Sequence, residues 1–367
     1  MARVRVLIVD DSVVVRRVLT DALSADPDLE VVGSAANGSI ALQKIPQVNP
    51  DVVILDVEMP ELDGVETVRR IRAGWPNLPV IMCSSLTERG GDTTLRALAN
   101  GASDYVTKPS QLGARDQNAL ALFKAELVAK IKALTSVQAL SSVVPLRRTT
   151  QASTRLAAGK APVTALAIGC STGGPNALAT LFQGIPRDIP VPVFITQHMP
   201  PLFTKLLADR LAVQTGMPVT EASAGDLVEP GRVYIAPGDF HMTVLRDGVR
   251  TRIALNQDPP ENSCRPAVDV MFRSIARLYG PGVLGTVLTG MGQDGARGAQ
   301  EIVDAGGSLI VQDAASCVVP SMPGAVVAAG LSEAQYPIDR LAQELMFRIR
   351  RHLAGGPMSM PNRRLEA

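Results

Sequence analysis

The sequence predicts two α/β domains in one chain, each with a mostly parallel sheet that helices cover on both faces. The 367 residues suffice for two domains of ordinary size, and 46% of them are hydrophobic, so each domain can bury a core. Short apolar runs alternate with helical periodicities from residue 6 to about 134, and the alternation resumes at residue 163.

The first region predicts a doubly wound, flavodoxin-like sheet of five parallel strands, because strand and helix alternate without interruption. The expected strands are at 6–9, 31–32, 52–55, 80–83 and 105–106. Helical spacing of apolar residues follows the first strand, and further helices are expected at about 39–45, 64–73, 92–100 and 118–134.

The second region predicts a doubly wound, mostly parallel sheet with one antiparallel hairpin. Its expected strands are at 164–168, 191–196, 218–222, 232–236, 283–288 and 308–312. Asp247-Gly248 between two apolar runs is a hairpin turn signal. We expect domains at 1–125 and 162–352, a linker at 126–161 and a flexible tail at 353–367.

Composition excludes several classes of function. A net charge of +1 gives no reason to expect nucleic-acid binding, and 3% aromatic residues argue against stacking on single strands. No apolar stretch is long enough to insert in a membrane. The four cysteines show neither paired nor metal-ligand spacing, which fits a reducing cytoplasm. We therefore expect a cytoplasmic protein.

Polar residues follow successive strands of the first domain, where a parallel sheet binds its ligands. They are Asp10, Asp11, Asp56, Ser84 and Lys108. Carboxylates that gather at one sheet edge favour Mg²⁺, and a carboxylate such as Asp56 can accept a phosphoryl group, whose oxygens Ser84 and Lys108 would hold. Each acid alone could simply cap a helix, but acids, serine and lysine in register favour a site.

The second domain opens with Gly169-Cys170-Ser171-Thr172-Gly173 between an expected strand and helix. This spacing lifts the Ser171 hydroxyl clear of the sheet, next to a helix N-terminus that favours negative charge. Alternatively, the glycines could make a packing turn or cradle a phosphate. Cys170 is a rival nucleophile, although alternation along the strand turns it inward.

A serine nucleophile needs a base and an acid that orients the base. His198 follows the expected strand at 191–196, at the same sheet edge as Ser171, and we prefer it to His241 and to His352 near the chain end. Asp294, in a glycine loop after the strand at 283–288, reaches this edge too. It could also cap the following helix, and both roles are compatible.

The first domain closely resembles the receiver domain of bacterial response regulators over about residues 3–125. The resemblance rests on Val9-Asp10-Asp11-Ser12, Leu55-Asp56-Val57-Glu58-Met59-Pro60, Ser84-Ser85 and Thr107-Lys108-Pro109. It implies that a histidine kinase phosphorylates Asp56. It also implies that Asp11, Asp56 and the Glu58 carbonyl bind Mg²⁺, with Asp10 acting through water.

The second domain resembles the catalytic domain of chemotaxis protein-glutamate methylesterases, from about Pro162 to His352. The motifs are Gly169-Cys170-Ser171-Thr172-Gly173-Gly174, Gln197-His198-Met199, Ile235-Ala236-Pro237-Gly238 and Leu288-Thr289-Gly290-Met291-Gly292-Gln293-Asp294-Gly295. The resemblance implies a triad of Ser171, His198 and Asp294, with Thr172 and Met291 lining the site and no cofactor for hydrolysis.

The implied activity is hydrolysis of γ-glutamyl methyl esters on chemoreceptors, with release of methanol, and deamidation of receptor glutamines in some members. Two alternatives remain open. The same esterase could act on a receptor-like protein outside motility control, or the chain could be a phosphorylation-switched adaptor without catalysis. The filled triad positions argue against the adaptor.

Overall fold

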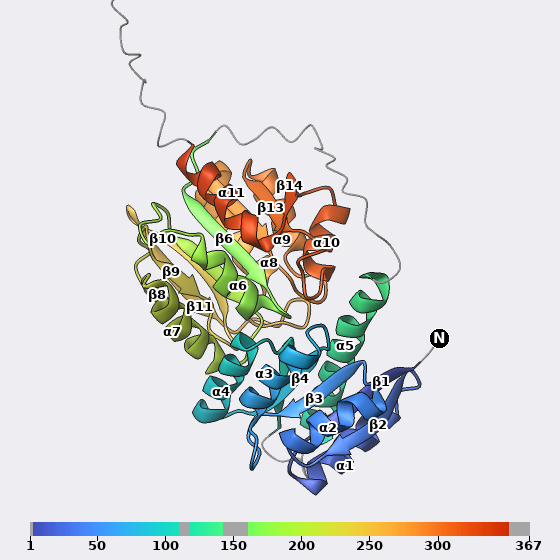
Figure 1. Ribbon diagram of the computed structural model, residues 1–367. Helices are drawn as coiled ribbons and strands as arrows, with labels where there is room; N and C mark the ends of the chain where they lie inside the picture. Colours follow the sequence, from blue (N-terminus) through green and yellow to red (C-terminus); the bar gives the residue numbers. More distant parts are fainter. Residues whose placement is uncertain (1–2, 110–116, 142–160, 352–367) are drawn as a thin grey trace, which may run out of the picture.

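The structure is a computed structural model that describes residues 3–109, 117–141 and 161–351. These residues form two α/β units, an N-terminal one at the bottom of Figure 1 and a C-terminal one at the top. His352 and the expected tail at 353–367 lie outside the described residues, as does most of the expected linker.

The N-terminal unit has the predicted five-stranded parallel sheet, in the order β2-β1-β3-β4-β5. Its strands are β1 (Val4–Val9), β2 (Leu29–Ala35), β3 (Val52–Asp56), β4 (Val80–Ser85) and β5 (Asp104–Lys108). Its helices are α1 (Val13–Ser24), α2 (Gly38–Val48), α3 (Gly64–Gly74), α4 (Glu88–Ala99) and α5 (Gln117–Ser141). The central strands are buried on both faces, as their continuous apolar runs require.

The C-terminal unit has a seven-stranded parallel sheet in the order β14-β13-β12-β6-β7-β9-β8, and a separate antiparallel hairpin. Its strands are β6 (Ala165–Cys170), β7 (Val193–Gln197), β8 (Val219–Glu221), β9 (Val233–Ile235), β10 (His241–Asp247), β11 (Arg250–Asn256), β12 (Val283–Val287), β13 (Ser308–Gln312) and β14 (Ala334–Tyr336). Its helices are α6 (Gly174–Gln183), α7 (Phe203–Thr215), α8 (Val268–Tyr279), η1 (Gly280–Gly282), α9 (Ala296–Asp304), α10 (Ser321–Ala328) and α11 (Ile338–Arg350).

Most expected strands are confirmed, and so is the hairpin, where Gly248 occupies the turn with φ 60°. The strand β14 was not predicted. It is an edge strand of three residues without a buried side chain, so it lacks the apolar alternation that identifies a strand.

Helix α5 continues past residue 125, where the sequence analysis ended the first domain. Leu127, Ile131 and Leu134 are buried against the N-terminal sheet, in one cluster with Ile54 and Val106. The packed residues of the N-terminal unit therefore extend beyond the expected boundary.

Helix α4 of the N-terminal unit contacts α6 and α7 of the C-terminal unit (Figure 1). Tyr105 of β5 joins this contact. The rings of Tyr105 and Phe203 stack with centroids 4.9 Å apart. Asn176 Nδ2 donates to Leu98 O at 2.8 Å, and an Arg210 guanidinium N–H donates to Leu95 O at 2.6 Å. One apolar cluster runs through both units at this contact.

Among the described residues, no helix combines the length and the apolar character needed to cross a membrane.

Candidate functional sites

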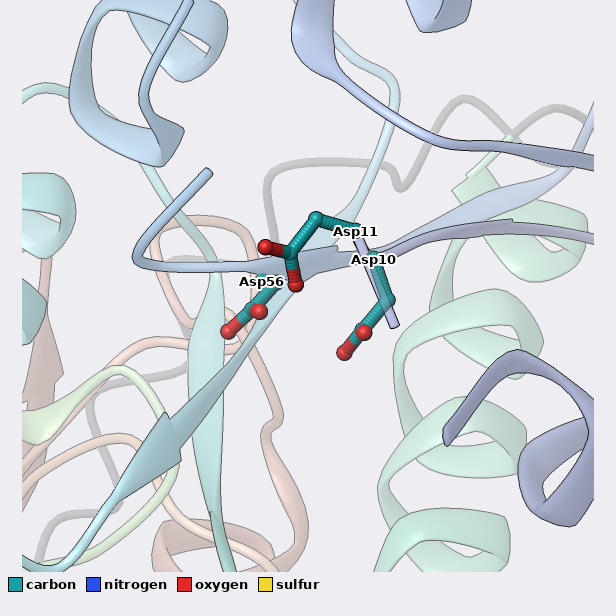
Figure 2. A group of neighbouring side chains, drawn as sticks. All are labelled: Asp10, Asp11 and Asp56. Atoms are coloured by element: carbon teal, nitrogen blue, oxygen red, sulfur yellow. The ribbon is translucent and has the colours of Figure 1, made fainter. Parts of the chain in front are cut away.

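The three acids of the N-terminal unit lie together at the carboxyl end of its sheet. Asp10 and Asp11 follow β1, and Asp56 is the last residue of β3, the neighbouring strand (Figure 2). Each offers a carboxylate oxygen within 4.8 Å of the others. Asp10 and Asp56 are buried, whereas Asp11 is exposed. Clustered carboxylate oxygens are the donor set that a hard cation such as Mg²⁺ prefers, so these residues fit a Mg²⁺ ion.

Lys108 at the end of β5 neutralises part of this charge. Its Nζ lies 2.7 Å from Asp10 Oδ2 and 2.8 Å from Asp56 Oδ1. Burial favours the neutral carboxyl and raises the pKa of Asp56 to about 6, although Lys108 opposes this shift. Burial also disfavours the Lys108 ammonium, but Cys83, Asp56 and Asp10 outweigh it and raise the pKa of Lys108. With a pKa of about 6, the Asp56 carboxyl is mostly ionised at neutral pH.

The side chains of two further residues predicted at this site have other partners, although the prediction for Glu58 concerns its backbone carbonyl and not its side chain. Ser84 is fully buried, and its Oγ lies 3.1 Å from Gly90 O and 3.2 Å from Ser85 O. The Glu58 side chain pairs with Arg89 at 3.3 Å, and both are exposed. Ser84 would have to turn away from these carbonyl oxygens before it could contact a phosphoryl group.

Ser171 directly follows β6, at the carboxyl end of the C-terminal sheet. Its N–H donates to Thr289 O at 3.0 Å, and its carbonyl accepts from Gly174 N at 2.7 Å, which closes the turn. Gly173 has φ 76°, a left-handed conformation that costs glycine little, and α6 begins at the next residue. The serine therefore lies beside a helix N-terminus, where developing negative charge is stabilised.

His198 directly follows β7, the neighbour of β6. Cys170 and Gln197 are partners in the parallel register, so Ser171 and His198 are the next pair along the two strands. Gln197 Nε2 lies 3.0 Å from Ser171 O and 3.2 Å from His198 O. This amide ties the two strand ends together and fixes their separation.

Asp294 lies beyond β12 and contacts His198 directly. Its Oδ2 is 2.8 Å from His198 Nε2, and its side chain is 2% exposed. Burial opposes ionisation, but His198 and the N–H groups of Val268 and Asp269 outweigh burial and lower the pKa of Asp294. The pair thus has the acid–histidine hydrogen bond of a hydrolytic triad, but through Nε2, whereas the Ser-His-Asp template uses Nδ1.

The contact of His198 with Cys264 was not predicted. Cys264 Sγ lies 3.5 Å from His198 Nδ1, the ring nitrogen that Asp294 leaves free. Burial disfavours the imidazolium, but Asp294 and Cys264 outweigh it and raise the pKa of His198 to about 9. No hydrogen bond joins Ser171 and His198 among the described residues. In this arrangement Cys264 therefore occupies the ring nitrogen that Asp294 leaves free.

The two other candidates that the sequence left open, Cys170 and His241, are both buried and hydrogen-bonded within the fold. Cys170 is fully buried, its Sγ donates to Thr196 O at 3.8 Å, and burial strongly raises its pKa. His241 is also fully buried. It accepts from Ala267 N through Nδ1 and lies 3.2 Å from Pro259 O through Nε2, so both ring nitrogens are engaged.

Thr172 and Met291, the other residues expected at this site, have contacts of their own. Thr172 is buried, and its carbonyl accepts from the Thr289 hydroxyl at 2.9 Å. Met291 packs against an apolar cluster that includes Val106 and Phe123 of the N-terminal unit. The N-terminal unit therefore contacts the loop that leads to Asp294.

Known proteins resemble both units. Residues 166–345 match the family model of the CheB methylesterase, and residues 6–116 match that of the response regulator receiver domain. A protein-glutamate methylesterase/protein-glutamine glutaminase of Trichodesmium erythraeum is 49% identical over 356 residues, which are 95% of this chain and 100% of the relative. A protein of the same description from a Nocardioides species is 49% identical over 361 residues, 96% of this chain and 97% of the relative.

One solved structure that resembles the C-terminal unit is the CheB methylesterase catalytic domain of Thermotoga maritima. It is 38% identical, covers 51% of this chain and 98% of its own, and has a TM-score of 0.49.

Proposed function

The chain belongs to the CheB family of receiver-linked protein-glutamate methylesterases/protein-glutamine glutaminases, and from this premise we propose that Ser171, His198 and Asp294 carry its hydrolytic activity. The contact of His198 with Asp294, next to Ser171 in the strand register, supports this assignment most directly. We propose a receiver domain at 1–125 and a catalytic domain at 162–352. The intervening linker, 126–161, begins with the part of α5 that packs on the receiver, and 353–367 is the tail.

The chemistry follows from the positions of these side chains. Ser171 Oγ attacks the γ-carbonyl carbon of a glutamyl methyl ester, and the neutral form of His198 accepts the serine proton through Nδ1 once this atom has left Cys264. Backbone N–H groups near the glycine turns stabilise the oxyanion, with Thr172 and Met291 beside it. The protonated histidine gives its proton to the departing methanol. It then activates a water that hydrolyses the acyl-enzyme, and a glutamine substrate releases ammonia by the same steps.

The partners are those that the two domains require. A chemotaxis histidine kinase donates the phosphoryl group to Asp56, and methylated chemoreceptors are the substrates. Asp11, Asp56 and the Glu58 carbonyl would hold Mg²⁺, with Asp10 through water, while Lys108 and a reoriented Ser84 contact the phosphoryl oxygens. The ion would neutralise phosphoryl charge. Because these partners act in the cytoplasm, we place the enzyme there.

Regulation follows from the contact between the domains. Helix α4 and β5 of the receiver pack on α6 and α7, the helices that follow Ser171 and His198. The unphosphorylated receiver thus restricts access to the site, and phosphorylation of Asp56 weakens the contact. A fragment that begins at Ala161 should exceed the unphosphorylated full chain in activity and ignore the phosphodonor. A slower fragment would contradict simple occlusion.

The experiment that tests the hydrolytic assignment replaces Ser171 with Ala in the full chain. Methanol release from methylated receptor should be abolished, while acetyl phosphate should still label Asp56, because the two sites lie in separate units. Cys170→Ala is the matched control and should stay active. Hydrolysis near the wild-type rate in Ser171→Ala would remove Ser171 as the nucleophile. An adaptor would show no hydrolysis in the wild type either.

A further inference from the structure

A second buried carboxylate, that of Asp269, lies behind Asp294. The side-chain amide of Asn262 connects the two acids, because Nδ2 donates to Asp294 Oδ1 at 2.9 Å and to Asp269 Oδ2 at 2.8 Å. Asp269 is 1% exposed and Asp294 is 2% exposed. Two buried carboxylates so close together are unfavourable unless hydrogen-bond donors surround both of them.

The two acids cap each other's helices: Asp294 caps α8, which carries Asp269, and Asp269 caps α9, which follows Asp294. Asp294 precedes α9, yet it accepts from the N–H groups of Val268 and Asp269 at the start of α8, at 2.6 and 3.0 Å. Asp269 stands in the first turn of α8 and accepts from Gly295 N at 3.0 Å and Gly298 N at 2.7 Å, at the start of α9. Helix N-termini have unpaired N–H groups, so both acids satisfy donors that would otherwise be buried without acceptors.

This arrangement determines how the Asp294 carboxylate is turned. Its Oδ2 accepts from His198 and Val268, and its Oδ1 accepts from Asn262, Asp269 and Gly295. The carboxylate cannot rotate away from His198 without breaking bonds to both helices and to Asn262.

We propose that Asn262 and Asp269 are positioning residues of the hydrolase, which hold Asp294 Oδ2 against His198 Nε2. Neither residue was singled out by the sequence motifs. Asn262 acts through its amide, and Asp269 acts through α9 and through its charge. The inference rests on the proposed function of the Ser171 site.

The backbone at Asn262 allows a clean test. Its φ is 51°, a left-handed conformation that asparagine tolerates and glycine adopts at little cost. Asn262→Gly therefore removes the amide and keeps the backbone. Ser263 also has a left-handed φ, 62°, and is exposed, so Ser263→Gly makes the same kind of change one residue away and is the matched control.

The measurement is methanol release by the phosphorylated full chain across pH. Asn262→Gly and Asp269→Asn should each lower kcat by about 10- to 100-fold with little change in KM. Loss of a residue that orients a metal-binding side chain through a hydrogen bond has an effect of this size. The groups that can titrate around the imidazole are Asp294, Cys264 and, behind Asp294, Asp269. Asp269→Asn removes a negative charge from this set, so the acid limb of the kcat profile should move to lower pH. Ser263→Gly should match the wild type.

NMR titration of the His198 ring reports positioning without turnover. The pKa of His198 should be lower in Asp269→Asn, and the signal of the His198 ring N–H that is bonded to Asp294 should change in Asn262→Gly. The unfolding temperature of each variant shows whether it is folded. Wild-type kcat, pH profile and ring signals in both variants would overturn the proposal. A loss of kcat that is fully explained by a smaller fraction of folded protein would also overturn it. An inactive wild-type chain would instead defeat the proposed function, and the NMR result would still decide the positioning.

Discussion

Arg210 on α7 offers the most direct test of how the receiver restrains the hydrolase. Its guanidinium donates to Leu95 O on α4 at 2.6 Å, so the bond exists only while the two domains are in contact. Arg210→Ala removes the charged donor and leaves the Leu95 carbonyl of the receiver without this hydrogen bond.

The size of the effect follows from the kind of bond that is lost. A hydrogen bond to a charged group contributes about 1.5–3 kcal/mol, which corresponds to roughly a 10- to 150-fold shift of the equilibrium toward the open arrangement. The gain in activity cannot exceed the factor by which the receiver suppresses the enzyme. Coupling between two sites is typically about 5- to 150-fold, so this range is the upper limit of the gain. Arg210→Ala should therefore remove most of the inhibition.

The assay compares methanol release by the unphosphorylated full chain and by a fragment that begins at Ala161. Arg210→Ala should raise the rate of the full chain and leave the fragment unchanged. Arg187→Ala is the matched control, because Arg187 also donates to a backbone carbonyl, Thr215 O at 3.0 Å, but within the catalytic domain. An Arg210→Ala chain that is no faster than Arg187→Ala, yet still responds to phosphorylation, would refute the proposed role of this contact.

Three other predictions concern single groups in the two sites. Asp294→Asn should lower turnover by roughly ten-thousand-fold, as in a comparable triad, because the amide cannot serve all the donors that Asp294 now satisfies. A loss of only a few-fold would mean that Asp294 chiefly caps helices. Labelling of Asp56 by acetyl phosphate should slow as the pH falls through about 6, because the neutral carboxyl is a poor nucleophile. A rate that is flat from pH 7 to 5 would contradict the raised pKa. The pKa of Asp56 is higher in the folded chain than in the unfolded chain, so the folded chain binds the proton more tightly. The Asp56 contribution to stability should therefore rise as the pH falls through about 6, measured as an increase in unfolding temperature.

Much of the site could be predicted because strand ends are visible in the sequence. The apolar runs before Asp56, Ser171 and His198 mark strands, and in a parallel sheet their carboxyl ends share one edge. The residues that surround these groups left no such signal. Cys264, Asn262 and Asp269 lie in an irregular loop and a first helical turn, where neither periodicity nor spacing indicates which distant side chain they contact.

The sequence by itself determined the two parallel sheets, the hairpin at Asp247-Gly248 and the residues at the strand ends, because each depends on local periodicity or on a turn. Only the tertiary structure decided which ring nitrogen of His198 faces Asp294, that Cys170 and His241 are buried and engaged, and that the Ser84 hydroxyl lies against the Gly90 carbonyl oxygen. It also decided that α4 packs on α7. These features depend on contacts between segments far apart in the chain, and such contacts are set by packing and by buried hydrogen bonds rather than by any local pattern.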